Sequence, residues 1–312
     1  MKKRPSPLRA IDLFAGCGGL SRGLQEAGIP VLAGVDHWAP ARTIYARNLG
    51  HDALDIDLAD VEGAVAVLSK YKPTLVAGGP PCQEFSAAGT RQEGARADLT
   101  RAYAEIVARL RPRWVVMENV PQVRDSSSYQ AARAVLKAAG YGLTERVLDA
   151  SRCGVPQARK RFFAIGRFGG PDGELDAAID AALAPAPLTL RAYLGAEAAA
   201  WPNAYYRHPR TYERRAIYTL DEPSATIRGV NRPRPKTYGT DKRDYHKQDA
   251  VKDGTVQALT SDQRARIQTF PPGWDWCHDS LSKTDVEQAI GNAVPVGLGA
   301  FVGGLIRRHE AA

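Results

Sequence analysis

Apolar and polar positions alternate in blocks along the first half of the chain, and these blocks predict strands and helices in turn. The apolar run AIDLFAG at residues 10–16 precedes LSRGLQEAG at residues 20–28, which has helical spacing and ends at Gly28. Further strands are predicted at residues 31–36, 74–79 and 114–120 and near 141–148 and 161–166, with helices at 40–48, 99–110 and 129–140. Such alternation predicts a doubly wound, mostly parallel α/β sheet.

The pattern changes after Gly170. Residues 171–200 are rich in alanine and leucine, and residues 201–255 are rich in proline, arginine and tyrosine with little periodicity. A helical pattern returns at residues 261–270, and the tail at residues 287–309 reads as one final amphipathic helix. We therefore expect a larger domain and a smaller, more irregular one, with boundaries at 1–170 plus 285–312 and at 171–284.

Composition places the chain among globular proteins. Its 312 residues are 44% hydrophobic and 24% charged. No run of about 18 apolar residues occurs, and no apolar segment follows the basic N-terminus, so neither a membrane span nor a signal peptide is expected. The four cysteines are far apart and form no CxxC motif. This spacing argues against a disulfide framework or a structural metal and favours a reducing cytoplasm.

Charge gives the first indication of a partner. The formal net charge is +8, and residues 201–250 hold eleven Lys and Arg against six Asp and Glu. The same stretch contains Trp201 and six tyrosines. Cations interleaved with flat rings are suited to a nucleic-acid surface, although an ordinary solvated face has the same composition.

The stretch DLFAGCGG at residues 12–19 predicts a glycine-rich turn between the first strand and the first helix. Open α/β sheets bind ligands beyond the carboxyl ends of their strands, where glycine lets the backbone approach the ligand. Asp36 ends the second predicted strand, 20 residues after Gly16, where an acid would bind ribose hydroxyls. Because a full GxGxxG is missing, another adenosine-bearing cofactor such as S-adenosylmethionine is favoured over a dinucleotide. A plain tight turn with a solvated Asp36 is the alternative.

The nonapeptide GGPPCQEFS at residues 78–86 places Cys82 just beyond the third strand. Pro80 and Pro81 restrict the backbone, so the direction of the thiol is largely fixed. Core filling is the alternative to a nucleophile, and a nucleophile would need a nearby positive charge or a hydrogen-bond donor.

Two further features end strands of the same sheet. Glu118, in the tripeptide ENV, ends the fourth strand and is expected near Cys82, where a buried acid could give a proton to a ring nitrogen. In QARKR, Gln157, Arg159 and Arg161 alternate and therefore share one face of a strand. A salt-bridged glutamate and solvated arginines are the structural alternatives.

Taken together, DLFAGCGG, GGPPCQEFS, ENV, QARKR and QAIGNAVPV, in this order, resemble the DNA (cytosine-5)-methyltransferase family. The resemblance covers nearly the whole chain except the middle of residues 171–255. It implies the Rossmann-like fold of S-adenosylmethionine-dependent methyltransferases, with a smaller target-recognition domain.

The resemblance also implies a cofactor site for S-adenosylmethionine, with S-adenosylhomocysteine as product and no metal. The residues that would form it are Phe14, Gly16, Gly18, Gly19, Asp36, His37, Asp57, Leu58, Pro80, Leu99, Asn292 and Ala293. Asp55 is a rival to Asp57 for the adenine. The ring that meets the adenine is His37 or, one residue later, Trp38.

The implied reaction is methylation of cytosine at C5. The base is rotated out of the duplex, Cys82 adds to C6, Glu118 binds or protonates N3, and Arg159 and Arg161 keep the surroundings positive. The implied DNA contacts are Gln83, Ser86, Gln157, Arg228, Arg232 and Arg234. Amino-methylating DNA enzymes are excluded because they carry a different proline-proline-aromatic motif and lack this cysteine.

The expected partner is double-stranded DNA, modified at a specific sequence by a bacterial, cytoplasmic monomer associated with the nucleoid, and a restriction endonuclease is a candidate functional partner. Two alternatives stay open from the residues alone. One is a tRNA cytosine-5 methyltransferase of the same fold. The other is a non-catalytic DNA-binding relative, against which the intact Cys82, Glu118 and Arg161 argue.

Overall fold

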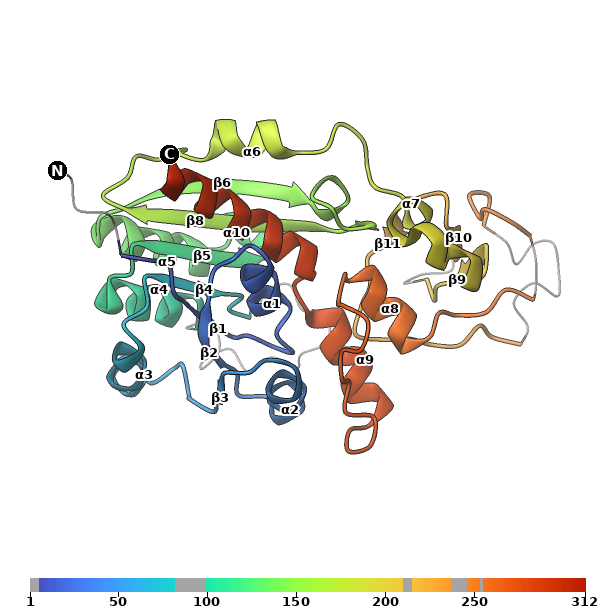
Figure 1. Ribbon diagram of the computed structural model, residues 1–312, viewed down its shortest axis with the longest axis horizontal. Coiled ribbons are helices and arrows are strands. Elements are labelled where there is room, and N and C mark those ends of the chain that lie inside the picture. The colour runs from blue at the N-terminus through green and yellow to red at the C-terminus, as the bar shows by residue number, and fades with distance from the viewer. Residues whose placement is uncertain (1–5, 82–98, 210–214, 237–245, 253–254) are drawn as a thin grey trace.

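The computed structural model describes residues 6–81, 99–209, 215–236, 246–252 and 255–312 (Figure 1). Seven strands form one sheet in the order β3-β2-β1-β4-β5-β8-β6. Neighbouring strands are parallel except at β8, which runs antiparallel to both β5 and β6. The prediction of a doubly wound, mostly parallel sheet is confirmed.

The elements of this layer follow the predicted alternation. The strands are β1 Ala10–Leu13, β2 Val31–Val35, β3 Asp52–Leu54, β4 Leu75–Gly78, β5 Trp114–Asn119, β6 Tyr141–Asp149 and β8 Lys160–Phe168. The helices are α1 Gly19–Glu26, α2 Ala39–Asn48, α3 Val61–Leu68, α4 Leu99–Leu110, α5 Ser127–Ala138, α6 Asp176–Ala182 and α10 Val296–Ala311, with short 3-10 turns η1 Ser69–Tyr71, η2 Pro121–Asp125 and η3 Ala150–Arg152. The sequence pattern missed β3, α3 and α6, which are three, eight and seven residues long.

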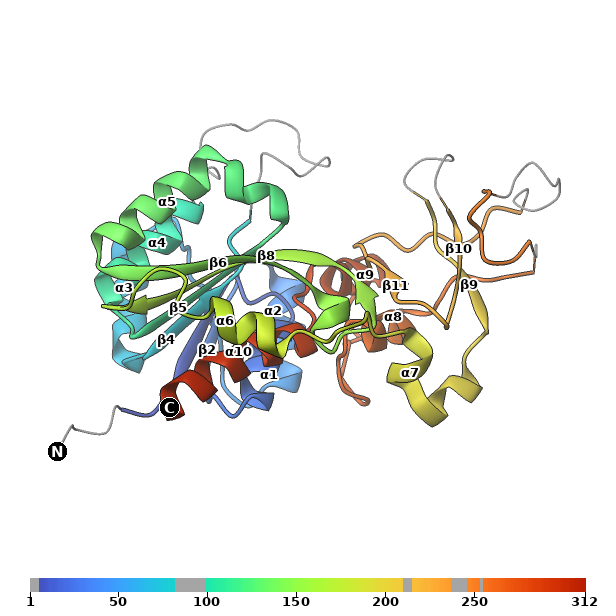
Figure 2. The same cartoon turned by 90° about the horizontal axis from the view of Figure 1, so that it is seen from above.

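Two hydrophobic cores enclose the sheet. Ile11 and Leu13 of β1 point into one of them, with residues of α3, α4 and α5, whereas Ala10 belongs to the other, with residues of α1, α6 and α10. Figure 2 shows these two helix layers on opposite faces of the sheet. Because successive strand residues point to opposite faces, the near-continuous apolar strands are what a sheet covered on both sides requires.

The predicted single C-terminal helix is wrong, because the chain forms α9 Lys283–Asn292 and then α10, with a break at residues 293–295. Pro295 lacks an N–H and restricts the residue before it, so a helix cannot continue unchanged through this point. The stretch Lys283–Ala311 is apolar and long enough to cross a membrane by those two measures alone, with a mean hydropathy of 1.7. However, 67% of its apolar window is buried inside the molecule, as in a core helix. The expectation of no membrane association stays a prediction.

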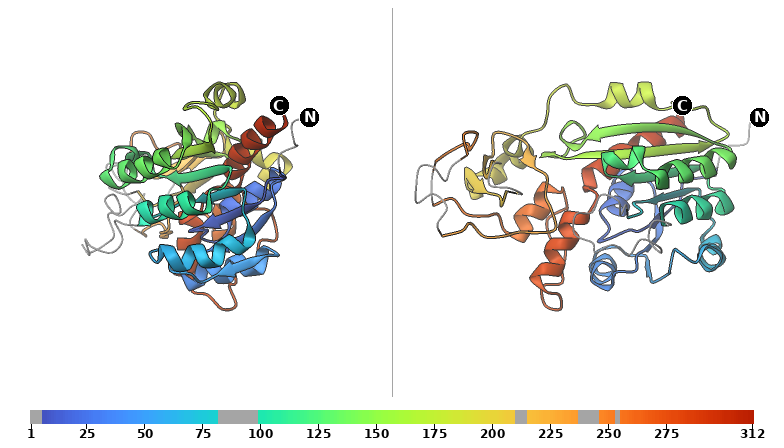
Figure 3. Two further views of the ribbon diagram at one scale, coloured as in Figure 1. Left: turned by 90° about the vertical axis from the view of Figure 1, so that its left-hand side faces the viewer. Right: turned by 180° about the vertical axis from the view of Figure 1, so that it is seen from behind.

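A second lobe lies at one end of the sheet (Figure 3). It contains α7 Leu190–Leu194, η4 Gly195–Ala200, β9 Ala204–Tyr206, β10 Ile217–Thr219, β11 Ser224–Ala225 and α8 Ser261–Ile267. The short strand β7 Gln157–Ala158, just before β8, pairs in parallel with β11 and so leads from the sheet into this lobe. In contrast, Leu175 and Ile179 of α6 pack with the sheet core.

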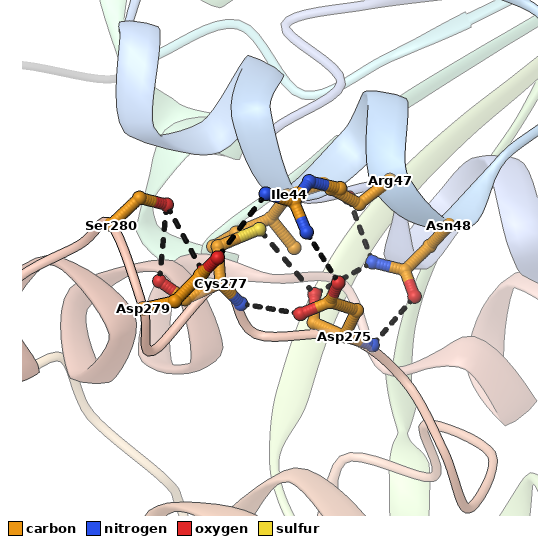
Figure 4. A network of polar contacts seen from close by, with 7 residues as sticks. All are labelled: Ile44, Arg47, Asn48, Asp275, Cys277, Asp279 and Ser280. Carbon is orange, nitrogen blue, oxygen red and sulfur yellow. Dashed lines mark hydrogen bonds and ion pairs between the residues drawn. The ribbon is translucent and has the colours of Figure 1, made fainter.

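The loop between α8 and α9 attaches the second lobe to α2 (Figure 4). Asn48 of α2 donates to the Asp275 carbonyl over 2.8 Å and accepts the Asp275 N–H over 2.7 Å. Arg47 lies 3.1 Å from the Asp275 carboxylate and 3.4 Å from that of Asp279. Since α2 begins three residues after Asp36, the position of this part of the sheet edge depends on the second lobe.

Replacing Gly291 by alanine should destabilise the fold strongly. A Cβ at this residue would lie 2.0 Å from the Gly229 nitrogen and 2.2 Å from the Arg228 carbonyl carbon, and backbone atoms cannot move aside as a side chain can. Overpacking of this kind costs about 1–3 kcal/mol, measured here as the free energy of unfolding in urea.

The matched control is Gly50→Ala. No heavy atom lies within 4 Å of the Cβ position of this exposed glycine, so unfolding should be nearly unchanged. Equal stabilities of the two variants would contradict the close approach of α9 to residues 228–229.

Candidate active site

The carboxyl ends of β1, β2, β4 and β5 bring the predicted site residues to one edge of the sheet. Phe14 follows β1, Asp36 follows β2, and Gly79 and Pro80 follow β4. Glu118 is the second-to-last residue of β5. These four strands are adjacent and parallel, so their ends meet. Cys82, Gln83 and Ser86 lie outside the described residues.

The glycine loop has the backbone that its sequence predicts. Phe14, Gly16 and Gly18 have φ values of 57°, 55° and 92°, in the left-handed region that favours glycine. Among the described residues, no heavy atom lies within 4 Å of a Cβ built on Gly16, whereas a Cβ on Gly19 would lie 2.1 Å from the Val294 carbonyl oxygen. The loop therefore has open space at Gly16 and is closed against the turn between α9 and α10 at Gly19.

Asp36 is bound directly to this loop. Its two carboxylate oxygens accept the Gly16 N–H and the Trp38 N–H, each over 2.8 Å. Burial raises the pKa of Asp36, and the two N–H donors oppose that shift. The structure thus brings together the loop and the acid that the sequence placed 20 residues apart, with the carboxylate held in a fixed orientation.

The sequence left open whether His37 or Trp38, and whether Asp57 or Asp55, would meet the adenine. The His37 ring is 86% exposed and lies 3.2 Å from Asp55, which also pairs with Arg42. Trp38 instead packs against a hydrophobic core that residues of α2 and of the second lobe form together. Asp57 is exposed and accepts the Ala59 N–H. The ring of His37 and the carboxylates of Asp55 and Asp57 are exposed, whereas Trp38 is half-buried. The residues that would meet the adenine therefore stay a prediction.

The other predicted cofactor residues differ in exposure. Leu58 is buried in the core under α3 and α4, and Pro80 is buried beside β5. Leu99 is half-buried at the start of α4, Asn292 is exposed, and Ala293 is buried. Only Asn292 of this group presents its side chain freely, and the rest line or support the edge.

Glu118 and Arg161 form the charged centre of the site. Arg161 Nε lies 3.0 Å from Glu118 Oε1, and the side chains of Arg161 and Glu118 are only 15% and 10% exposed, respectively. Burial raises the pKa of Glu118, while Arg161 and Arg159 lower it. The other oxygen, Oε2, lies 3.0 Å from the Cβ position of Gly79, so the glycine admits the carboxyl to the loop that leads to Cys82.

Asn119 is a residue of this site that the sequence reasoning missed. Its side-chain Nδ2 donates to the Pro80 carbonyl over 2.8 Å, and its Oδ1 accepts the Val120 N–H. Pro80 lies two residues before Cys82, so Asn119 fixes the approach of the cysteine turn to β5. The available signal was its place directly after Glu118 at the strand end.

Arg159 occupies a different place from the predicted one. Its buried guanidinium donates to the carbonyl oxygens of Ile227, Gly291 and Ala293, over 2.8, 3.1 and 3.1 Å. Burial, together with Arg161, lowers the pKa of Arg159 well below its usual value. The side chain therefore joins the link between β7 and β8 to the second lobe and to the end of α9, and it acts on Glu118 only through its charge.

Gln157 is a correction to the predicted DNA contacts. The side chain is fully buried, donates to Gln268 over 2.7 Å and accepts the Ile227 N–H over 2.8 Å. The alternation of Gln157, Arg159 and Arg161 onto one inward face is confirmed, but that face meets the protein interior at Gln157. A contact with DNA would require both hydrogen bonds to break.

The candidate arginines of the second lobe are not equivalent. Arg228 is half-buried, donates to the His208 carbonyl and accepts a bond from Arg264 at its own carbonyl. Arg264 in turn pairs with buried Glu287 of α9. Arg232 is exposed and Arg234 is half-buried. Arg232 is thus the candidate most available for a ligand.

The three described cysteines are unsuited to nucleophilic chemistry. Cys17, Cys153 and Cys277 are all buried and unpaired. Burial raises the pKa of Cys17 and of Cys153 to about 12, and raises that of Cys277 as well. Within the described residues no cluster of three His, Cys, Asp or Glu side chains could hold a metal ion.

The strand order with one reversed strand, and the site at the carboxyl edge, define an α/β methyltransferase fold. The solved structure of Dnmt2 methyltransferase from S. pombe matches 97% of this chain and 99% of its own, with a TM-score of 0.71 at 18% identity. A putative DNA modification methyltransferase from an E. coli prophage matches 96% of this chain and 99% of its own, with a TM-score of 0.69 at 18% identity.

Sequence comparison gives the family. The model for C-5 cytosine-specific DNA methylase matches residues 8–172 and 192–308. Type II methyltransferase M.HgiDI from Herpetosiphon aurantiacus is 47% identical over 95% of this chain and 93% of its own length. Type II methyltransferase M.HindV from Haemophilus influenzae is 46% identical over 97% of each. The chain therefore belongs to the C-5 cytosine-specific DNA methylase family and is a DNA cytosine-5 methyltransferase.

Replacing Asn119 by alanine should slow methylation with little loss of stability. The Pro80 carbonyl loses its donor, and a catalytic group misplaced by about 1 Å can cost roughly 100-fold in rate. Single-turnover methylation and urea unfolding measure the two effects. Gln130→Ala is the control, because that amide also donates to a carbonyl, over 2.8 Å, on an exposed face of α5. Equal rates for the two variants would remove Asn119 from the site.

Proposed function

We propose that this cytosine-5 methyltransferase protects a specific duplex DNA sequence as the modification partner of a restriction endonuclease. Support comes from the two type II relatives, which are 46–47% identical over nearly the whole chain. The basic, aromatic second lobe suits a DNA surface. A tRNA substrate has weaker support, since the Dnmt2 likeness is at 18% identity and concerns the fold alone. We further propose a monomer that acts in the bacterial cytoplasm.

The cofactor is proposed to be S-adenosylmethionine, held by the glycine loop and Asp36. When bound, it supplies an electrophilic methyl group on a positively charged sulfur. The open space at Gly16 admits a ligand close to the backbone, and the fixed Asp36 carboxylate is placed to accept ribose hydroxyls. Phe14, His37, Asp57, Leu99 and Asn292 complete the proposed contacts, with Leu58, Pro80 and Ala293 behind them.

The observation that carries the mechanism is the buried pair of Glu118 and Arg161 against the loop that leads to Cys82. Cys82 is proposed to add to C6 of a cytosine rotated out of the duplex, a rotation that costs a few kcal/mol. Glu118, whose pKa is raised by burial against the opposing effect of Arg161, is proposed to give a proton to N3, so that C5 becomes electron-rich. After methylation, loss of the C5 proton and elimination of Cys82 restore the ring.

The two arginines are proposed to act differently. Arg161 holds the Glu118 carboxyl toward the base and adds positive charge where the adduct forms. Arg159 is a positioning residue, because its donors are used on backbone carbonyls. Gln83, Ser86, Arg228, Arg232 and Arg234 remain proposed DNA contacts, with arginines able to pair with guanine edges.

The domain division is also a proposal. The target-recognition domain is expected at residues 171–284, and the packing of Leu175 and Ile179 on the sheet core favours a start after α6. The catalytic domain then comprises residues 1–182 and the returning C-terminal segment from residue 285.

Cys82 should form a denaturation-resistant adduct with duplex DNA that contains 5-fluorocytosine, in the presence of S-adenosylmethionine. Fluorine at C5 cannot leave as a proton does, so elimination of the cysteine is blocked. Cys82→Ala should form no adduct, whereas Cys153→Ala should, because that thiol is buried and protonated. Gel electrophoresis after denaturation measures the adduct. An adduct with Cys82→Ala, or with tRNA in preference to DNA, would overturn the proposal.

The rate of methylation should depend on pH through the protonation of Glu118. As the pH rises through the raised pKa of Glu118, the donor is lost and the rate of single-turnover methylation falls. Glu118→Gln should lower the rate by about 100-fold or more and abolish this alkaline decline. Glu145→Gln is the control, since this acid on β6 pairs with Arg133 over 3.0 Å away from the site. A Glu118→Gln profile that keeps the decline would exclude Glu118 as the donor.

A further inference from the structure

A buried chain of hydrogen bonds runs from Asp12 to His51. Ser21 Oγ lies 2.7 Å from Asp12 Oδ2 and 2.9 Å from the Tyr45 hydroxyl, which lies 2.6 Å from His51 Nε2. Asp12, Ser21 and Tyr45 are almost completely buried, and His51 is half-buried. The chain thus connects the interior end of β1, through α1 and α2, to a ring near the surface.

The chemistry of these groups allows a proton to move along the chain. An ionised Asp12 only accepts, so Ser21 donates to it, Tyr45 donates to Ser21, and His51 donates to Tyr45. If Asp12 is protonated, each hydroxyl can turn and donate in the opposite direction, toward a neutral His51 Nε2. A proton can therefore leave Asp12 by successive transfers, with each hydroxyl giving up one proton and receiving another.

The position of Tyr45 depends on the cofactor loop. A Cβ on Gly18 would lie 3.1 Å from the Tyr45 ring, and one on Gly34 of β2 would lie 2.4 Å from its hydroxyl oxygen. The two glycines make room for the ring between the loop and the sheet. The chain is consequently part of the same structure that holds Gly16 against Asp36.

The described groups that act on Asp12 are acidic or neutral. Ser21 of α1 donates to it, Tyr45 of α2 and Tyr103 of α4 face it as neutral phenols, and Asp36 and Glu118 act on it from the ends of β2 and β5. Its other oxygen, Oδ1, is buried and accepts no hydrogen bond from a described residue. Burial, reinforced by the two acids, raises the pKa of Asp12 to about 7.

We propose that Asp12 couples cofactor binding to a proton: binding of cationic S-adenosylmethionine releases a proton from Asp12 through Ser21, Tyr45 and His51 to solvent. This inference rests on the proposed cofactor. A positive sulfur bound at the edge where Asp12, Asp36 and Glu118 converge favours the ionised form of Asp12. S-adenosylhomocysteine has lost that charge, so it releases much less of the proton. The enzyme thereby distinguishes the methyl donor from its product by charge, and more strongly at higher pH.

The test is isothermal titration calorimetry of the full-length protein with each compound, without DNA, in two buffers of different ionisation enthalpy. Near pH 7, where the pKa of Asp12 makes it about half protonated, wild type should release about half a proton with S-adenosylmethionine. Its affinity for that compound should weaken as the pH falls below 7, by up to tenfold per pH unit. The affinity for S-adenosylhomocysteine should change less.

Asp12→Asn should bind with no proton release, and Glu118→Gln should keep most of it. Tyr45→Phe removes the donor to Ser21, so the midpoint of the affinity profile should move to higher pH. Tyr129→Phe, which removes a hydroxyl bonded to Glu145 elsewhere, should leave the midpoint unchanged.

Undiminished proton release by Asp12→Asn would overturn the inference, as would binding by wild type without release. If Asp12→Asn fails to fold, an unmoved midpoint in Tyr45→Phe overturns it equally. Failure of wild type to bind either compound would refute the cofactor assignment, and the inference with it. Adduct formation on DNA that still requires S-adenosylmethionine would separate these cases.

Discussion

The buried guanidinium of Arg159 is the interaction on which the rest of the structure depends. Arg159 lies between β7 and β8 and donates to the carbonyl oxygens of Ile227, of Gly291 at the end of α9 and of Ala293 just after it, beside the hydrogen bonds of Gln157 and Gln268. An arginine buried this deeply is costly unless its donors are used. Here Nη1 and Nη2 donate to three carbonyls, two of which lie at the end of α9, where a helix leaves carbonyls unpaired. Loss of the side chain would leave the carbonyl oxygens of Ile227, Gly291 and Ala293 without this donor.

The active site takes its geometry from that junction. Two residues beyond Arg159, on β8, Arg161 meets Glu118, so Arg159 and the pair of Glu118 and Arg161 share one short run of backbone. The glycine loop is pressed against the turn at Val294, directly after the carbonyls that Arg159 binds. The glycine loop, Glu118 and the second lobe are therefore held together by contacts around Arg159 and Val294.

Sequence patterns predicted the elements whose information is local. The strand ends at Asp36 and Glu118, the loop at Gly16 and the inward face of residues 157–161 all follow from short-range spacing and were found correctly. What failed depended on distant partners. Alternation shows that Gln157 points inward, but not that Gln268, 111 residues later, meets it there. The tail looked like one helix because its apolar spacing continues across Pro295. Asn119 was overlooked because its partner is the Pro80 carbonyl, which no side-chain pattern marks, so its place after Glu118 at the strand end was the one available signal.

The choice of backbone carbonyls as the partners of Arg159 has an evolutionary consequence. A carbonyl oxygen is present whatever amino acid occupies the position, so most side chains around residue 227 can be exchanged without removing the acceptor. Under the target-recognition role proposed for the second lobe, its side chains can then diverge toward new target sequences while the positions of Glu118 and Arg161 are kept. The attachment through Arg159 does not depend on the identity of the side chains around its acceptors.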